Sequence, residues 1–124
     1  MTLRVSFRGH DIVRFCCRGI MIPIIYLLFA ILLEVAGTTS MKISNGFTET
    51  LPSIFIFVFY GLSFVFLTLT LKRMEVSVAY AAWSGLGTFC IALIGWGYFH
   101  EPMTAIKAAS LSFIILGVVG LKLG

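Results

Sequence analysis

The sequence predicts an all-α integral membrane protein, a bundle of four transmembrane helices. Of its 124 residues, 60% are hydrophobic and only 11% are charged, so a soluble domain of this size would lack the polar surface needed to cover its core. The apolar residues form four runs of about 20 residues, the length that a helix needs to cross roughly 30 Å of hydrocarbon. Helices are required because lipid cannot satisfy the exposed edges of strands.

A basic N-terminal extension, residues 1–20, precedes the predicted membrane domain, residues 21–124. Its arginines outnumber its one acidic residue, Asp11; they are Arg4, Arg8, Arg14 and Arg18. The extension is either a cytoplasmic tail or the product of an upstream start codon with Met21 as the true initiator. The abrupt start of apolar sequence after Gly19 favours the second interpretation. In a third, residues 1–33 begin a cleaved signal peptide with a weak cleavage-like site at Ala36-Gly37.

The first predicted span, residues 22–41, contains one charge, Glu34. The second, residues 51–71, is uncharged and has Pro52 near its start, where a missing N–H costs little. The third, residues 76–99, is also uncharged, and the fourth, residues 104–122, has Lys107 and Lys122 near its ends. The connections are short, so neighbouring helices are expected to be antiparallel within one domain.

The formal net charge of +4 is expected to set membrane orientation, and it does not imply a nucleic-acid partner. Counting residues 1–20, the positive-inside rule places both termini in the cytoplasm. Without them the charge bias is small enough to let the same chain insert in both orientations, so single and dual topology stay open. The cysteines Cys16, Cys17 and Cys90 form neither a metal-ligand spacing nor a disulfide framework, although the adjacent pair is a conceivable palmitoylation site.

Glu34 is the candidate functional group. A charge near the middle of a membrane helix costs about 2.5–3.5 kcal/mol, and such residues usually have a task. No lysine or arginine lies at a similar depth in the predicted spans, while the small residues Ala30, Gly37 and Thr38 share the face of Glu34. The sequence therefore predicts a proton-binding or cation-binding site. The alternative is a protonated glutamate making one interhelical hydrogen bond.

Aromatic residues are expected to line the same site. Tyr80, Trp83 and Ser84 share one face of the third helix, and Tyr60, Ser63 and Phe64 share one face of the second. Aromatic rings attract cations by about 0.5–2 kcal/mol, and the Tyr80 hydroxyl is expected to reach Glu34. The alternative for Tyr80 and Trp83 is an interfacial belt.

Small residues suggest bending and association. Gly85 and Gly87 lie within the third helix, which predicts a hinge or, alternatively, close packing. Ser110 and Gly117, seven residues apart on the fourth helix, are the predicted dimer contact, with packing inside one chain as the alternative. A dimer is expected because four short helices are few to enclose a large cavity with two gates.

A carboxylate among aromatic rings suits a lipophilic organic cation, and the same carboxylate can bind a proton instead. Binding either ion but never both is the minimal chemistry of antiport. Other classes remain as alternatives: a passive partner subunit, an ion channel without its usual ring of charges, or an enzyme without a recognisable catalytic set. No cofactor or metal is expected. His10 and His100 lie outside the spans, and His100 with Glu101 is expected to form a solvated loop pair.

Several motifs together resemble the small multidrug resistance family: EVAGTT at residues 34–39, SNGFT at 44–48 and VAYAAWSGLG at 78–87. The resemblance covers about residues 21–124. It implies a multi-pass protein of the bacterial cytoplasmic membrane that exports cations in exchange for protons, as an antiparallel homodimer or a heterodimer with a paralogue.

The resemblance also implies residue roles. Glu34 is the shared proton and substrate site, Tyr80 and Trp83 are cavity aromatics, and Tyr60 and Ser63 support them. Gly85 and Gly87 form a bend in the third helix. Gly117 is half of the dimer contact, and Ser110 stands where the family usually has glycine, which puts the strength of that contact in doubt.

Two family subtypes compete. Gly37 and the Trp83-Ser84-Gly85 motif resemble exporters of quaternary ammonium compounds and dyes, whereas residues 101–122 look more like guanidinium exporters. The cavity-lining residues favour the multidrug type. Polyamine export by a heterodimer remains a third possibility.

Overall fold

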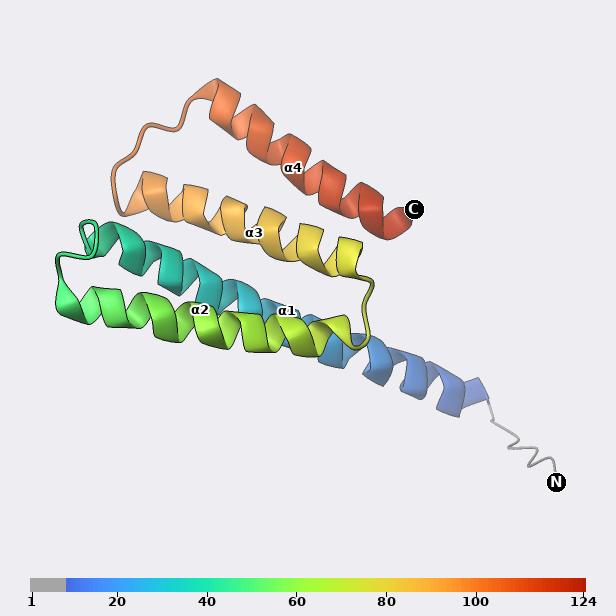
Figure 1. Ribbon diagram of the computed structural model, residues 1–124. Coiled ribbons are helices and arrows are strands. Elements are labelled where there is room, and N and C mark those ends of the chain that lie inside the picture. The colour runs from blue at the N-terminus through green and yellow to red at the C-terminus, as the bar shows by residue number, and fades with distance from the viewer. Residues whose placement is uncertain (1–8) are drawn as a thin grey trace.

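A computed structural model describes the backbone of residues 9–124 and side chains from residue 19 onward. The elements are α1 (Gly9–Ile43), α2 (Thr50–Leu71), α3 (Val76–Gly97) and α4 (Ala105–Leu123). Consecutive helices run antiparallel, so α1 and α3 are parallel to one another (Figure 1). Each helix holds a segment long and apolar enough to cross a membrane, and in α1 this segment is Gly19–Ile43. The prediction of four transmembrane helices is confirmed.

Helix α1 begins at Gly9, well before the predicted start at residue 22, and its first turns extend past the other helices in Figure 1. The helix continues through Pro23, whose carbonyl oxygen accepts a 3.4 Å hydrogen bond from Thr70 Oγ1 of α2. The role of residues 1–20 as a separate extension stays a prediction. Its basic and cysteine side chains lie outside those described: Arg4, Arg8, Arg14, Arg18, Cys16 and Cys17.

The core lies between α1, α2 and α3. It is a cluster of buried apolar side chains: Leu27, Ala30, Ile31, Val35, Leu67, Ala82 and Trp83. Buried hydroxyls within these helices donate to backbone carbonyl oxygens, as Ser63 Oγ does to Ala30 O at 2.6 Å and Thr70 Oγ1 to Phe66 O at 3.0 Å. Such pairing is required because lipid offers buried polar groups no partner.

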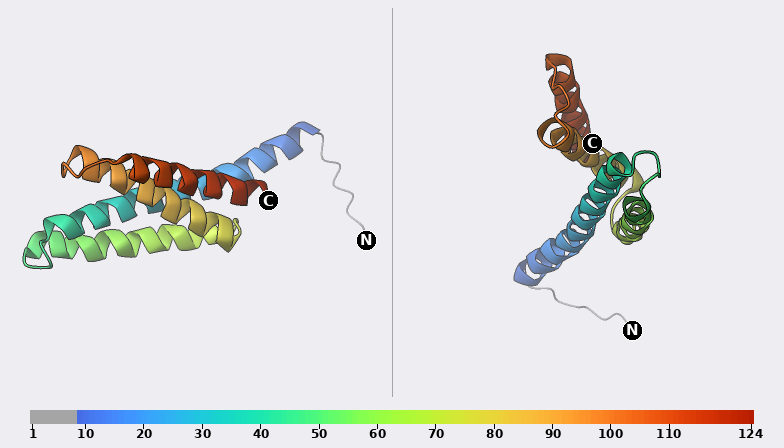
Figure 2. Two further views of the ribbon diagram at one scale, coloured as in Figure 1. Left: turned by 90° about the horizontal axis from the view of Figure 1, so that it is seen from above. Right: turned by 90° about the vertical axis from the view of Figure 1, so that its left-hand side faces the viewer.

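Helix α4 packs against α3 alone and has no buried residue, which Figure 2 shows as a helix set to one side of the other three. The contact is close at Gly85, where an added Cβ would lie 2.7 Å from Val118 Cγ2 and 3.3 Å from Ile114 Cγ2. The remaining apolar surface of α4 faces outward, so it is available to lipid or to another helix.

Helix α3 ends at Gly97, earlier than the predicted residue 99. Ile94 O accepts hydrogen bonds from both Tyr98 N at 2.8 Å and Phe99 N at 3.2 Å, and His100 then takes a positive φ of 55°. This left-handed residue redirects the chain, so the boundary prediction from apolar composition alone ran past the true end.

Candidate functional site

Glu34 projects from α1 toward α3, where it meets Gly87. The approach is so close that a Cβ on residue 87 would collide with the carboxylate. Glu34 is partly buried, and its Oε2 atom is buried without a hydrogen-bond partner. Leaving a buried polar atom unpaired is unfavourable, so this oxygen is free to bind a proton or a ligand.

The hydrogen bond expected from Tyr80 to Glu34 is not made to this oxygen. Tyr80 is 56% exposed and lies at the edge of the aromatic group instead. The ion pair present among the described side chains joins Lys42 to Glu101 and does not involve Glu34.

Trp83 is fixed by a polar chain across three helices. Its Nε1 donates to Ser63 Oγ at 3.4 Å, and Ser63 Oγ in turn donates to Ala30 O at 2.6 Å. Ala30 lies one turn before Glu34 in α1, and Trp83 lies one turn before Gly87 in α3. Since α1 and α3 run parallel, Ala30 and Trp83 lie on the same side of the carboxylate. Two predicted site residues, Trp83 and Ser63, are thus brought together one turn from the carboxylate.

Tyr60 joins α2 to α1 on the other side of Glu34. Its hydroxyl shares a 2.6 Å hydrogen bond with Thr38 Oγ1, and either atom can donate. Gly37 permits this approach, since an added Cβ there would lie 2.5 Å from Tyr60 Cδ2. Gly37, Thr38 and Tyr60 therefore form one contact, and their role in binding stays a prediction.

A row of aromatic rings connects these groups. The ring centroids are 6.2 Å apart for Tyr60 and Phe64, 5.9 Å for Phe64 and Trp83, and 5.5 Å for Trp83 and Tyr80. Sequence reasoning placed Phe64 on the face of Tyr60 but did not identify it as the bridge to Trp83. This bridge depends on how α2 is positioned against α3, and no sequence pattern indicates that position.

Gly85 and Gly87 face different neighbours. Gly87 accommodates the Glu34 carboxylate, whereas Gly85 accommodates α4. Helix α3 is continuous through both positions, so the close packing considered as the alternative is present and the hinge stays a prediction.

Ser110 and Gly117 of α4 lie in different surroundings. Ser110 lines a cavity of about 330 Å³ between α3 and α4, together with Trp96 and Ile106. Gly117 has open space where a Cβ would stand. Their role as a dimer contact stays a prediction. No group of three or more metal-binding side chains occurs among the described residues.

Sequence comparisons identify similar proteins. The family model for Small Multidrug Resistance protein matches residues 22–114. An uncharacterized membrane protein of Bacillus subtilis, YvaE, is 52% identical over 99 residues, covering 80% of this chain and 83% of the relative. The multidrug transporter EmrE of Escherichia coli is 42% identical over 101 residues, covering 82% of this chain and 92% of EmrE. The quaternary ammonium compound-resistance protein QacE of Escherichia coli is 41% identical over 99 residues, covering 80% of this chain and 90% of QacE.

Proposed function

Because this chain belongs to the small multidrug resistance family and is a multi-pass protein of the bacterial inner membrane, we propose that it exports lipophilic and quaternary ammonium cations in exchange for protons. The observation that carries this proposal is the Glu34 carboxylate, held against Gly87 with one buried oxygen unpaired. Relatives named for multidrug transport and quaternary ammonium resistance support the substrate class.

Charge balance explains how one carboxylate can couple the two ions. A protonated Glu34 is neutral, and an ionised Glu34 paired with an organic cation is neutral as well. The ionised and empty site carries an unbalanced charge within the membrane, which is costly. The site therefore crosses between the two membrane faces most readily when loaded with a proton or a cation, which is the condition for exchange.

The aromatic row supplies the selectivity for organic cations. The faces of Trp83 and Tyr80 attract a soft cation without forming a full ion pair, and their area suits a bulky apolar ligand. Ser63 holds the Trp83 indole in place, so the ring need not be ordered again when a cation binds.

A second copy of the chain, or a paralogue, would complete the cavity. One chain leaves Tyr80 more than half exposed and leaves α4 without a buried residue. Both surfaces are apolar and extensive, and either lipid or a second subunit has to cover them. The dimer is therefore part of the proposal.

Transport into proteoliposomes tests the function. A pH gradient is expected to drive tetraphenylphosphonium exchange by the native chain, and Glu34→Gln is expected to reduce it to the level of protein-free liposomes. Glu75→Gln, which neutralises an exposed glutamate at the start of α3, is the matched control and should transport normally.

Two outcomes of the same assay would contradict the proposal. Normal coupled transport by Glu34→Gln would remove the site assignment. Transport of guanidinium without tetraphenylphosphonium would replace the multidrug substrate class by the guanidinium class.

A further inference from the structure

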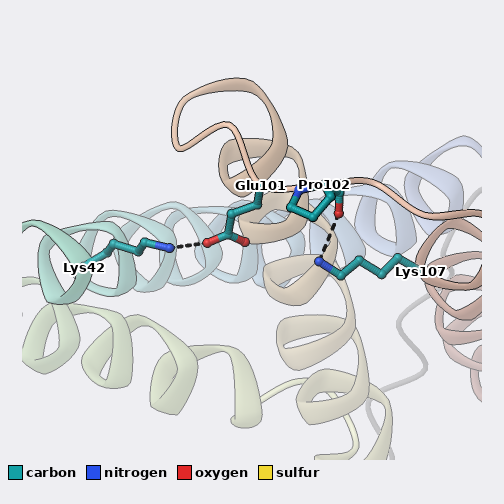
Figure 3. A network of polar contacts seen from close by, with 4 residues as sticks. All are labelled: Lys42, Glu101, Pro102 and Lys107. Carbon is teal, nitrogen blue, oxygen red and sulfur yellow. Dashed lines mark hydrogen bonds and ion pairs between the residues drawn. The ribbon is translucent and has the colours of Figure 1, made fainter.

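Beyond the membrane-embedded site, a contact between α1 and the α3–α4 connection closes one end of the bundle. Lys42, in the last turn of α1, forms an ion pair with Glu101, as Figure 3 shows. Glu101 lies beside His100 in the solvent-accessible connection, as expected, but it also pairs with Lys42 of another helix, which was not expected.

The backbone of α3 holds Glu101 in place. Glu101 N donates a 2.8 Å hydrogen bond to Gly95 O, and the preceding His100 has the positive φ that directs the chain there. The carboxylate lies against Gly95, where an added Cβ would be 2.8 Å from Oε2. Gly95 thus gives Glu101 the room to lie across α3 and reach α1.

Lys42 is held from a second direction. Its Nζ lies 5.0 Å from the centroid of the Phe99 ring, a cation–π distance. Phe99 and Glu101 both follow the end of α3, so Lys42 ties the end of α1 to this one short segment. Lys107 lies on the other side of the connection and donates to Pro102 O at 3.1 Å (Figure 3).

A cavity of about 350 Å³ lies beneath this contact. Lys42, Phe99 and Glu101 line it together with Thr38, Thr39, Met41, Ile91, Ile94 and Gly95. Thr38 is one turn of α1 from Glu34 and is the hydrogen-bond partner of Tyr60. The cavity therefore extends from the Lys42–Glu101 pair at the surface to within one helical turn of the carboxylate.

We propose that the Lys42–Glu101 pair is a gate that closes this end of the α1–α3 cavity and must open before water or a cation reaches Thr38 and Glu34 from that side. The assignment as a gate for transported cations rests on the proposed function. An exposed pair of this kind is weak, and the two side chains are 53% and 43% exposed. A weak contact suits a gate because it can open repeatedly without a large barrier.

Thiol labelling of the cavity tests the gate. In a chain whose own cysteines, Cys16, Cys17 and Cys90, are changed to alanine, a cysteine replaces Ile94. The protein is then placed in lipid nanodiscs, so that both membrane faces are accessible. The rate of reaction with iodoacetamide, a neutral reagent, then reports how often water reaches the cavity.

Lys42→Gln and Glu101→Gln are each expected to speed labelling by about 1.5-fold to 5-fold, the range for loss of a half-exposed ion pair. The double variant should label no faster than the faster single variant, because both changes open the same contact. Gly95→Ala should also speed labelling although it keeps both charges, since its Cβ displaces the Glu101 carboxylate. Lys72→Gln, which removes an exposed positive charge from the α2–α3 connection at the other end of the bundle, is the matched control and should label at the parent rate.

Labelling of the two single variants at the parent rate would overturn the gate, as would a double variant whose acceleration equals the product of the single effects. The assay measures water access without any transport. A failure of the gate therefore leaves tetraphenylphosphonium exchange unaffected, and a failure of the proposed function shows as absent exchange with the labelling differences intact.

Discussion

Helices α1–α3 and helix α4 differ in what they do with their side chains. The first three bury apolar residues against one another and join buried hydroxyls to backbone oxygens across helices. Helix α4 contacts α3 only and has no buried residue. Its N-terminus is capped by Thr104, whose Oγ1 accepts a 3.2 Å hydrogen bond from Lys107 N. The candidate site lies wholly within the first group.

The difference suggests a division of roles within one subunit. In lipid, close packing and hydrogen bonds hold helices together because apolar burial between helices brings no gain over lipid. The three-helix group has both, so it can hold Glu34, Trp83 and Tyr60 in fixed positions. Helix α4 has one close contact at Gly85, so it is free to serve an intersubunit contact.

The largest expected effect is that of Gly87→Ala. Its Cβ would occupy the space of the Glu34 carboxylate, the end of a flexible side chain, so the variant is expected to lose cation exchange as the carboxylate moves and to cost about 1 kcal/mol of stability, the lower end of the cost of overpacking. Gly85→Ala should reduce exchange less, because its Cβ meets Val118 on a helix that contacts only α3 and can shift. Exchange rates and unfolding in detergent measure both.

Gly61→Ala is the control for both variants, since an added Cβ at Gly61 meets nothing within 4 Å. A Gly87→Ala protein that still exchanges cations at the native rate would show that the carboxylate has another position available. Equal losses at Gly85 and Gly87 would remove the distinction between the two regions.

Ser63→Ala is expected to cost about 2 kcal/mol, because the buried Trp83 indole N–H loses its acceptor. Cation affinity should fall as well, since the ring is no longer fixed. Ser84→Ala is the matched control, because the Ser84 hydroxyl donates within its own helix to Tyr80 O at 2.9 Å. Tetraphenylphosphonium titration and unfolding separate the two effects, and equal behaviour of the variants would refute the role of Ser63.

Gly117→Leu probes α4 with a smaller effect. A Cβ at this position meets nothing within 4 Å in its own subunit, so subunit stability is expected to change little. If α4 contacts a second copy at this position, the dimer should weaken by about 1 kcal/mol, or roughly fivefold in dissociation constant. Cross-linking across a protein-to-detergent dilution series measures this, and an unchanged dimer would place the interface elsewhere.

The smallest effect concerns the pH dependence of the Lys42–Glu101 pair. The hydrogen bond from Lys42, then its positive charge, lowers the pKa of Glu101 below the usual 4.5. Since the folded pKa is depressed, the stabilisation is present above pH 4.5 and is lost as pH falls through the lower value. An NMR titration of the Glu101 carboxyl carbon should show a midpoint below 4.5 that rises in Lys42→Gln, and high salt should have a similar, weaker effect. An unchanged midpoint in Lys42→Gln would contradict the pair.

Several structural details were beyond prediction from the sequence. The extension of α1 back to Gly9 was missed because the span was predicted from its apolar run, which begins only after Gly19. The pairing of Glu101 with Lys42 was missed because the two residues are far apart in the chain and adjacent only where α1 ends beside the α3–α4 connection. No local sequence pattern predicts a contact between residues so far apart in the chain.

By itself, the sequence determined the four helices and marked Glu34 as the one charged residue within the first apolar run. Lipid demands apolar runs of a set length with internally bonded backbone, and it penalises any charge placed within them. Only the tertiary structure decided that Gly87 lies under the carboxylate, that Ser63 links Trp83 to Ala30, and that α4 stands apart. These contacts depend on how each helix is rotated and shifted against its neighbours, and that is set by side-chain packing between segments distant in the chain.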